Sequence, residues 1–161
     1  MEVVAEQGRL LAQQLPPSHP WSYREQWATS LMHRAAEAAA EVVLAARSDT
    51  GVVIADGTCA TPLVWHVCAA RSRPGYDVGP AEVTEELLAA VTDNNYDLVL
   101  LMAPDIPWVA DGIRDDPGGR EMAFDEYRTL LPDAVVVEGP DRLKIADGLV
   151  SGLLRMPSDL P

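Results

Sequence analysis

The feature that most constrains the fold is an unbroken apolar run, LVLLM at residues 98–102, bounded by Asp97 and Pro104. Runs of this kind are typical of strands that are buried on both faces of a parallel sheet. Similar short runs, separated by stretches with helical spacing, lie at residues 2–5, 52–54 and 134–138. The alternation predicts an α/β fold with three layers, in which helices cover both faces of one parallel sheet.

The longest predicted helix runs from Ser22 to about Arg47. Ser22 and Glu25 have the spacing of a capping box, in which two side chains satisfy N–H groups at the start of a helix. The apolar residues of this helix recur every three or four positions, which predicts a stripe that packs against the core. The stripe consists of Trp27, Leu31, Ala35, Ala38, Val42 and Ala45.

Length and charge narrow the class of protein. The 161 residues suffice for one domain with its own core, which we place at residues 1–154, followed by a loose tail at 155–161. With 25 acidic and 12 basic residues the net charge is −13, which disfavours contact with a nucleic-acid backbone. No apolar stretch reaches the roughly 18 to 20 residues of a membrane span. We therefore expect a cytoplasmic protein with neither nucleic acid nor membrane as a partner.

Two of the predicted strands are followed by an acidic residue. Asp56 comes just after the run at 52–54, and Asp105 just after the run at 98–102. Open α/β sheets bind their ligands at the carboxyl ends of the strands. An acid at that position can hold Mg²⁺ or accept a hydrogen bond from a substrate hydroxyl. The alternative for Asp56 is that it caps the helix behind it.

The loop after Asp105 gathers several unlike groups. Trp108 could stack on a flat ring of a ligand, and Arg114 could neutralise phosphate charge when the loop closes. The alternative is that Trp108 is a partly buried anchor and that Arg114 pairs on the surface with Asp111 or Asp115. Burial does not explain why all these groups follow the most apolar strand, and this favours a ligand site.

These segments carry a family resemblance. The run APDIPWVADGIRDDP, with IADGTCATPLVW and EGPDRLKIA, resembles the P-loop kinase domain of NadR-like ribosylnicotinamide kinases and related AAA-type ATPase domains, over residues 2 to about 154. The resemblance implies that the γ-phosphoryl group of ATP is transferred, with Mg²⁺, to the hydroxyl of a nucleoside such as nicotinamide riboside. It also implies a place in NAD metabolism.

The resemblance gives each candidate residue a role. Asp56 would be the strand-end acid that takes part in catalysis and holds magnesium, and Arg114 would be the catalytic arginine of the lid. The residues that would contact the nucleoside are Asp105, Trp108, Asp111 and Asp115. Arg142, after Gly139, would lie near the adenine of ATP.

The sequence departs from this family at the phosphate-binding loop. Such kinases use the motif G-x-x-x-x-G-K-[ST], whose backbone N–H groups and lysine hold the β- and γ-phosphates. The 161 residues contain no such motif, and the sole lysine, Lys144, lies in the last predicted helix. We therefore expect that the first strand and the phosphate loop are missing, as in a truncated gene product, and that ATP-dependent activity is weak or absent.

A missing first strand would leave two strand edges unpaired, because in these kinases it lies between the strands at 52–55 and 97–102. The two edges could pair with each other, or a second copy or a partner chain could fill the gap. Two alternatives to a kinase therefore stay open. One is a non-catalytic regulatory domain that binds a nucleoside or nucleotide, and the other is a protein-interaction module.

Overall fold

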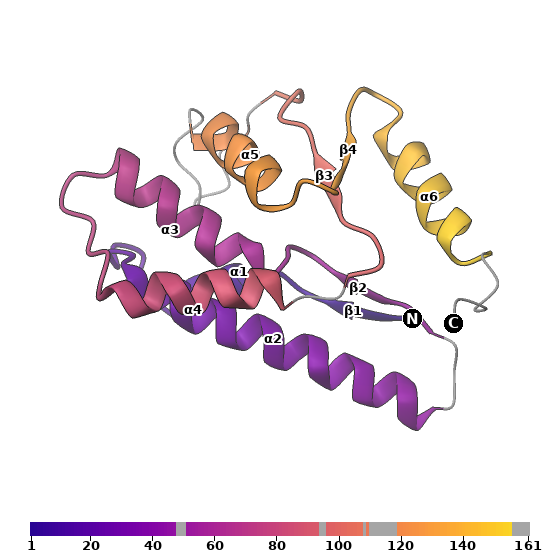
Figure 1. The fold of residues 1–161 in the computed structure, drawn as a ribbon, viewed down its shortest axis with the longest axis horizontal. Coiled ribbons are helices and arrows are strands. Elements are labelled where there is room, and N and C mark those ends of the chain that lie inside the picture. Colours follow the sequence, from indigo (N-terminus) through magenta and orange to yellow (C-terminus); the bar gives the residue numbers. More distant parts are fainter. Residues whose placement is uncertain (48–50, 94–95, 108, 110–118, 156–161) are drawn as a thin grey trace. The chain divides into compact units, whose positions relative to one another are not determined.

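A computed structural model describes residues 1–47, 51–93, 96–107, 109 and 119–155. Short strands are separated by one or two helices, as the sequence predicts (Figure 1). In chain order the elements are β1 (Glu2–Val4), α1 (Gln7–Ala12), α2 (Tyr23–Ala46), β2 (Val53–Ala55), α3 (Ala60–Ser72), α4 (Ala81–Thr92), β3 (Leu100–Met102), α5 (Gly119–Leu130), β4 (Val135–Val137) and α6 (Arg142–Leu153).

The chain divides into two compact units, Met1–Asn94 and Asn95–Pro161. The first unit contains β1, β2 and the helices α1 to α4, and the second contains β3, β4, α5 and α6. Within the part of the chain that the structure describes, no helix is long and apolar enough to cross a membrane.

The strands form two parallel pairs. In the first unit β1 pairs with β2, with Val3 opposite Ile54, and in the second unit β3 pairs with β4, with Leu101 opposite Val136. Among the described residues each pair is a separate two-stranded sheet. Parallel pairing is therefore confirmed, whereas the single three-layer sheet is not observed.

Among the described residues of each unit, no further strand pairs with the outer side of β2 or of β3, which we call the open edge. The carbonyl of Val52 and the N–H of Asp56 bond to β1, at 2.8 and 2.7 Å. Because backbone groups alternate in direction along a strand, those of Val53 and Ala55 face away from β1. In the second unit the carbonyl of Val99 and the N–H of Ala103 bond to β4. There the groups that face away are those of Leu100 and Met102.

The strands are less buried than their apolar sequences predict. Ile54 of β2 is 41% exposed and Met102 of β3 is 45% exposed, whereas Val137 of β4 is fully buried. A two-stranded sheet has too few neighbours to cover both of its faces. The prediction that these runs are buried on both faces is therefore wrong for β2 and β3.

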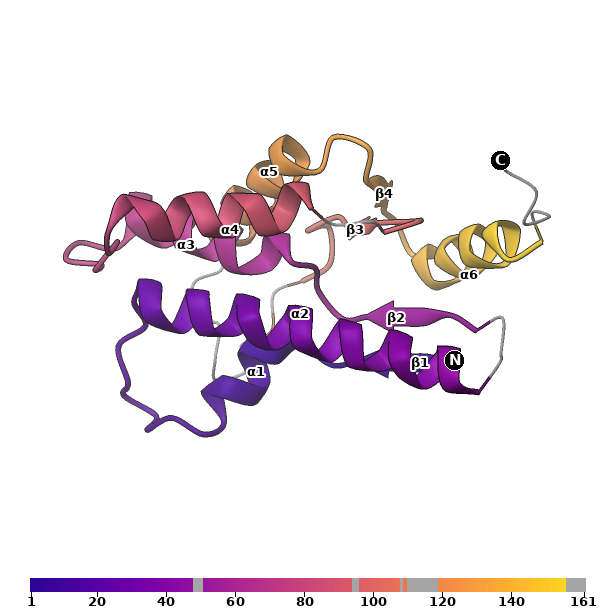
Figure 2. The ribbon, with the colours of Figure 1, turned by 60° about the horizontal axis from the view of Figure 1, so that its bottom comes forward.

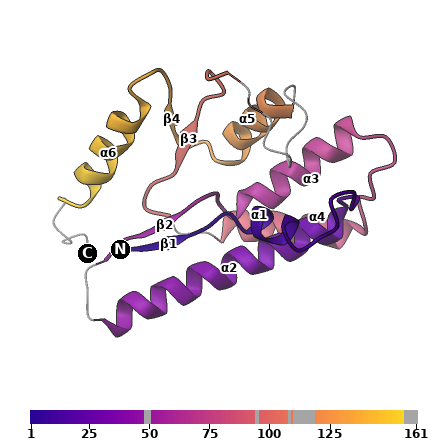
Figure 3. The same ribbon diagram turned by 180° about the vertical axis from the view of Figure 1, so that it is seen from behind.

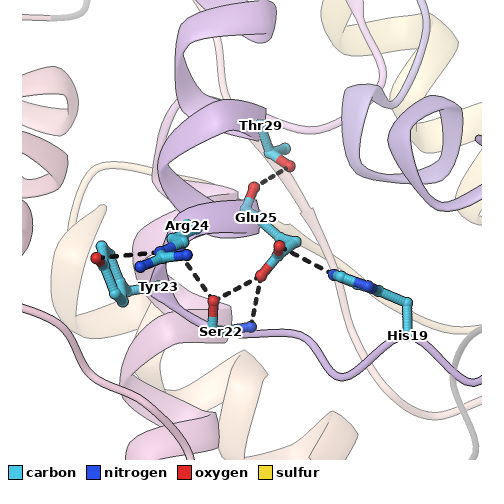
Figure 4. A network of polar contacts seen from close by, with 6 residues as sticks. All are labelled: His19, Ser22, Tyr23, Arg24, Glu25 and Thr29. Atoms are coloured by element: carbon cyan, nitrogen blue, oxygen red, sulfur yellow. Dashed lines mark hydrogen bonds and ion pairs between the residues drawn. The ribbon is translucent and has the colours of Figure 1, made fainter. Parts of the chain in front are cut away.

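Helix α2 runs along the β1–β2 pair, as Figures 2 and 3 both show, and it also packs against α1, α3 and α4. It begins with the predicted capping box (Figure 4). The N–H and the hydroxyl of Ser22 both donate to Glu25 Oε2 at 2.7 Å, and His19 Nε2 lies 3.0 Å from Glu25 Oε1. Burial alone would raise the pKa of Glu25, but these hydrogen bonds from Ser22 and His19 outweigh it and lower the pKa to about 2.

The face of α2 that points toward the core is polar. Thr29, Ser30 and His33 are each no more than 5% exposed, and Gln26 on the same face is buried too. The residues of the predicted apolar stripe are all exposed, so the expected packing direction of this helix is wrong. The short side chain of Thr29 lets α1 come close, since a Cβ on Gly8 would lie only 3.7 Å from Thr29 Cγ2.

Helices α3 and α4 pack against each other and supply much of the core of the first unit (Figure 1). Ala60 and Val64 of α3 and Leu87 of α4 are fully buried. A polar link joins the same two helices, because His66 Nδ1 lies 3.1 Å from the Tyr76 hydroxyl and His66 Nε2 lies 3.2 Å from Thr84 Oγ1. Burial lowers the pKa of His66 and raises that of Tyr76 to about 12.

Candidate functional site

A pocket lies where β1 and β2 end in the first unit. Because the strands are parallel, the residues that follow both of them lie at the same edge of the sheet. Glu6 follows β1 and Asp56 follows β2, and both line a small hollow that has room for about one water molecule and is partly open to solvent. Asp56 is a residue predicted from the sequence, whereas Glu6 is not. The same signal, an acid just past an apolar run, could have identified Glu6.

Asp56 is the acid of this pocket that has no partner. Its backbone N–H donates to the carbonyl of Val4 at 2.7 Å, but its exposed side chain makes no hydrogen bond or ion pair with any other described residue. The other acid, Glu6, is partly neutralised because its Oε2 lies 3.4 Å from Arg9 Nε. The Asp56 carboxylate is therefore the one available to a ligand.

The alternative role for Asp56, capping the next helix, is not observed. The residue before α3 is Cys59, and no side chain caps it. Instead two threonines order this turn: Thr58 Oγ1 accepts from the N–H of Ala60, and Thr61 Oγ1 accepts from the N–H of Thr58, both at 3.1 Å. Thr58 and Thr61 both line the pocket.

A buried histidine lines the inner part of the pocket. His33, on the polar face of α2, is 3% exposed. Glu37 Oε1 lies 3.2 Å from its Nε2, but the geometry is not that of a hydrogen bond, and Nε2 is the one buried side-chain polar atom of the described residues without a partner. Such an atom costs about 1 to 3 kcal/mol unless a ligand or water satisfies it. Nothing in the sequence singled His33 out, because a helix sequence does not show which face is buried.

The other polar groups near His33 are already satisfied within the protein. The hydroxyl of Thr29 donates to the carbonyl of Glu25 at 2.7 Å, and Gln7 Nε2 donates to the carbonyl of Ala5 at 2.8 Å. The residues that line the pocket thus include Asp56 at its rim, two threonines and a buried histidine whose Nε2 lacks a hydrogen-bond partner among the described residues.

No three of the His, Cys, Asp or Glu side chains of the described residues cluster as metal ligands, and the acids that line the pocket are Asp56 and Glu6. The sole lysine, Lys144, is exposed on α6, and the sequence holds no glycine-rich lysine loop for the phosphates of ATP.

Two of the predicted ligand residues meet in the second unit. Asp105, after β3, forms an ion pair with Arg142, the first residue of α6, and it also accepts from the N–H of Gly139 at 2.6 Å. The bond from Gly139 and the contact with Arg142 lower the pKa of Asp105. The predicted substrate residue Asp105 and the predicted adenine-side residue Arg142 are therefore paired with each other.

The remaining predicted residues, Trp108, Asp111, Arg114 and Asp115, lie outside the described residues. Their roles in binding and catalysis stay predictions, as do the substrate and adenine contacts predicted for Asp105 and Arg142.

Comparison with known proteins identifies the family. No curated protein and no solved structure matches the chain significantly. A family model described as an AAA domain matches residues 1–135, which is most of the chain and runs from β1 to the first residue of β4. The chain therefore belongs to this AAA domain family and has the ancestry of the P-loop nucleoside triphosphatases.

Proposed function

We propose that this chain carries the nucleoside-binding part of an ATP-dependent kinase of the ribosylnicotinamide kinase type. Family membership supports the P-loop ancestry. The resemblance of the loop after β3 to that of ribosylnicotinamide kinases supports a nucleoside as the ligand. The observation that carries the proposal is the Asp56 carboxylate, which has no partner among the described residues and stands at the carboxyl end of β2 over a pocket lined with hydroxyl groups.

The chemistry of the pocket favours a sugar. Asp56 accepts hydrogen bonds, whereas the hydroxyl of Thr58 can donate one, and a ribose carries hydroxyls that do both. A phosphate is disfavoured here, because Asp56 and Glu6 would repel it and none of the described residues that line the pocket is a lysine or an arginine. In a kinase, an acid beside the acceptor hydroxyl orients that hydroxyl and takes its proton. Asp56 would be this acid.

Phosphoryl transfer also requires a phosphate-binding loop, which these residues do not contain. ATP and Mg²⁺, when bound, would supply the phosphoryl group and balance its charge. We expect no nucleoside phosphate to form when the 161-residue chain is incubated with ATP, Mg²⁺ and nicotinamide riboside. A chain joined to a Gly-Lys-Ser/Thr loop from its own upstream coding sequence is expected to bind ATP. No gain after that extension would count against the kinase lineage.

Calorimetric titration tests recognition of the nucleoside. The panel contains nicotinamide riboside, adenosine, guanosine, cytidine and uridine, each compared with its 5′-monophosphate. We expect at least one nucleoside to bind, and to bind more tightly than its monophosphate. Asp56→Asn should weaken that binding by about tenfold or more and leave the melting temperature unchanged, because the side chain makes no contact among the described residues.

The matched control is Asp93→Asn, which changes another exposed acid of the first unit, at the end of α4. This variant should bind like the unmodified protein. Absence of binding by every nucleoside, or full affinity in Asp56→Asn, would contradict the proposed function.

The open edges of β2 and β3 favour a second candidate, a non-catalytic domain that binds a nucleoside or another chain. In the first case we expect tryptophan quenching by the nucleoside that Trp108→Ala abolishes, without any phosphate transfer. In the second case a partner strand would protect the backbone of Val53 and Ala55, which hydrogen exchange measures.

A further inference from the structure

The inner part of the pocket holds a group that the proposed function does not yet use. We propose that Nε2 of His33 is the contact point for one hydroxyl group of the ribose-type ligand of this pocket. The inference rests on the proposed function and adds a specificity-determining residue to it. It starts from the observation that His33 lines the pocket and that its Nε2 is buried and lacks a hydrogen-bond partner among the described residues.

The chemistry of the surroundings selects a hydroxyl. An imidazole nitrogen donates or accepts a hydrogen bond according to its tautomer. A hydroxyl group can pair with it in either case, because a hydroxyl both accepts and donates. An anion is disfavoured, because Glu37 Oε1 lies 3.2 Å from the nitrogen and Asp56 and Glu6 line the same pocket. A metal ion is disfavoured, because no three metal-binding side chains cluster among the described residues.

The position of His33 suits discrimination between sugars. The residue is 3% exposed and lies on the face of α2 that packs inside the first unit, so its ring is held before a ligand arrives. Asp56 is exposed, and Thr58 is only partly covered. A ribose could therefore reach Asp56 with one hydroxyl near the opening and His33 with another further in. An analogue that lacks the inner hydroxyl would leave Nε2 unsatisfied.

The test uses the ribonucleoside that binds best in the panel above, together with its 2′-, 3′- and 5′-deoxy forms. We expect one of the deoxy forms to bind at least about tenfold more weakly than the parent compound. His33→Leu replaces the ring by an apolar side chain of similar volume. In this variant the preference for the parent compound should fall to less than about threefold. His33→Gln, which can still hydrogen-bond, should keep more of it.

The matched control is His66→Gln. His66 is as buried as His33, at 3% exposure in the same unit, but both of its ring nitrogens have partners outside the pocket. This variant should keep the full preference for the ribonucleoside, so that a general effect of replacing a buried histidine is recognised.

A second measurement needs no variant and covers the case in which His33→Leu does not fold. The ring nitrogen resonances of His33 should shift on addition of the parent ribonucleoside and not on addition of the discriminated deoxy form. Unchanged resonances with the bound ribonucleoside, or a full preference retained by folded His33→Leu, would overturn this inference alone. If no nucleoside binds, the proposed function falls, and this inference falls with it.

Discussion

Asp105 and Arg142 form an ion pair across 37 positions of sequence, and this pair joins the end of β3 to the first residue of α6. The same carboxylate accepts from the N–H of Gly139, while Arg142 Nε donates to the carbonyl of Gly139 at 3.1 Å. No described residue of α6 is buried. The second unit therefore holds this helix largely by polar contacts near its start and by packing against β4.

We predict that Asp105→Ala loosens the start of α6. The substitution removes the acceptor for Gly139 and the partner of Arg142, so the backbone amides of Gly139 and of the first turn of α6 should exchange with solvent faster. Hydrogen exchange followed by mass spectrometry measures this. Asp141→Ala is the matched control, because Asp141 directly precedes α6 but its side chain does not cap the helix. Equal exchange in the two variants would contradict the prediction.

We predict that Ser22→Ala lowers the free energy of unfolding by about 1 kcal/mol at neutral pH, because it removes the hydroxyl of the capping box at the start of α2. Urea denaturation measures the loss. Ser18→Ala, which changes an exposed serine of the preceding loop, should leave the midpoint unchanged. A loss of the same size at both positions would argue against the capping box.

The pH dependence of this cap has a defined sign. Glu25 has a pKa of about 2 in the folded protein, against an ordinary value of 4.5. A carboxylate with a lowered pKa stabilises the fold fully above the pKa it has when unfolded. Its contribution should therefore be present above pH 4.5 and decline as the pH falls toward 2. Replacing Glu25 by Gln should remove this part of the acid sensitivity, which denaturation across this pH range would show.

We predict that protonation of His66 destabilises the first unit. Burial lowers the pKa of this histidine from its ordinary value of 6.5. A histidine with a lowered pKa binds its proton more readily in the unfolded chain, so stability falls as the pH drops below about 6.5. The melting temperature of the unmodified protein should therefore drop more between pH 7.5 and 5.5 than that of His66→Gln. A drop of the same size in both proteins would contradict this.

We predict alternating amide exchange along β2. The amide of Ile54 faces β1, whereas those of Val53 and Ala55 face the open edge, so Ile54 should be protected and its neighbours should exchange fast. Amide exchange followed by NMR resolves single residues. If a second copy or a partner occupies the edge, all three amides become protected, and dilution or removal of the partner restores the alternation. Protection of all three in a dilute monomer would contradict the open edge.

Much of the local structure could be predicted from the sequence, because local patterns determine it. The capping box at Ser22 and Glu25 marked the start of α2, as predicted. The candidate site could be predicted in part. Asp56 could be predicted because an acid that follows an apolar run lies at the carboxyl end of a strand, where α/β folds bind ligands. His33 was not found, since its importance depends on burial.

The sequence by itself determined the order of the strands and helices, their parallel pairing and the acid at the end of β2. Only the tertiary structure decided that α2 turns its polar face inward, that Asp105 pairs with Arg142, and that His33 lies beside Asp56 at one pocket. The physical reason is the range of the interactions. Caps, turns and apolar runs act over a few residues, whereas packing and ion pairing depend on segments that are distant in the chain.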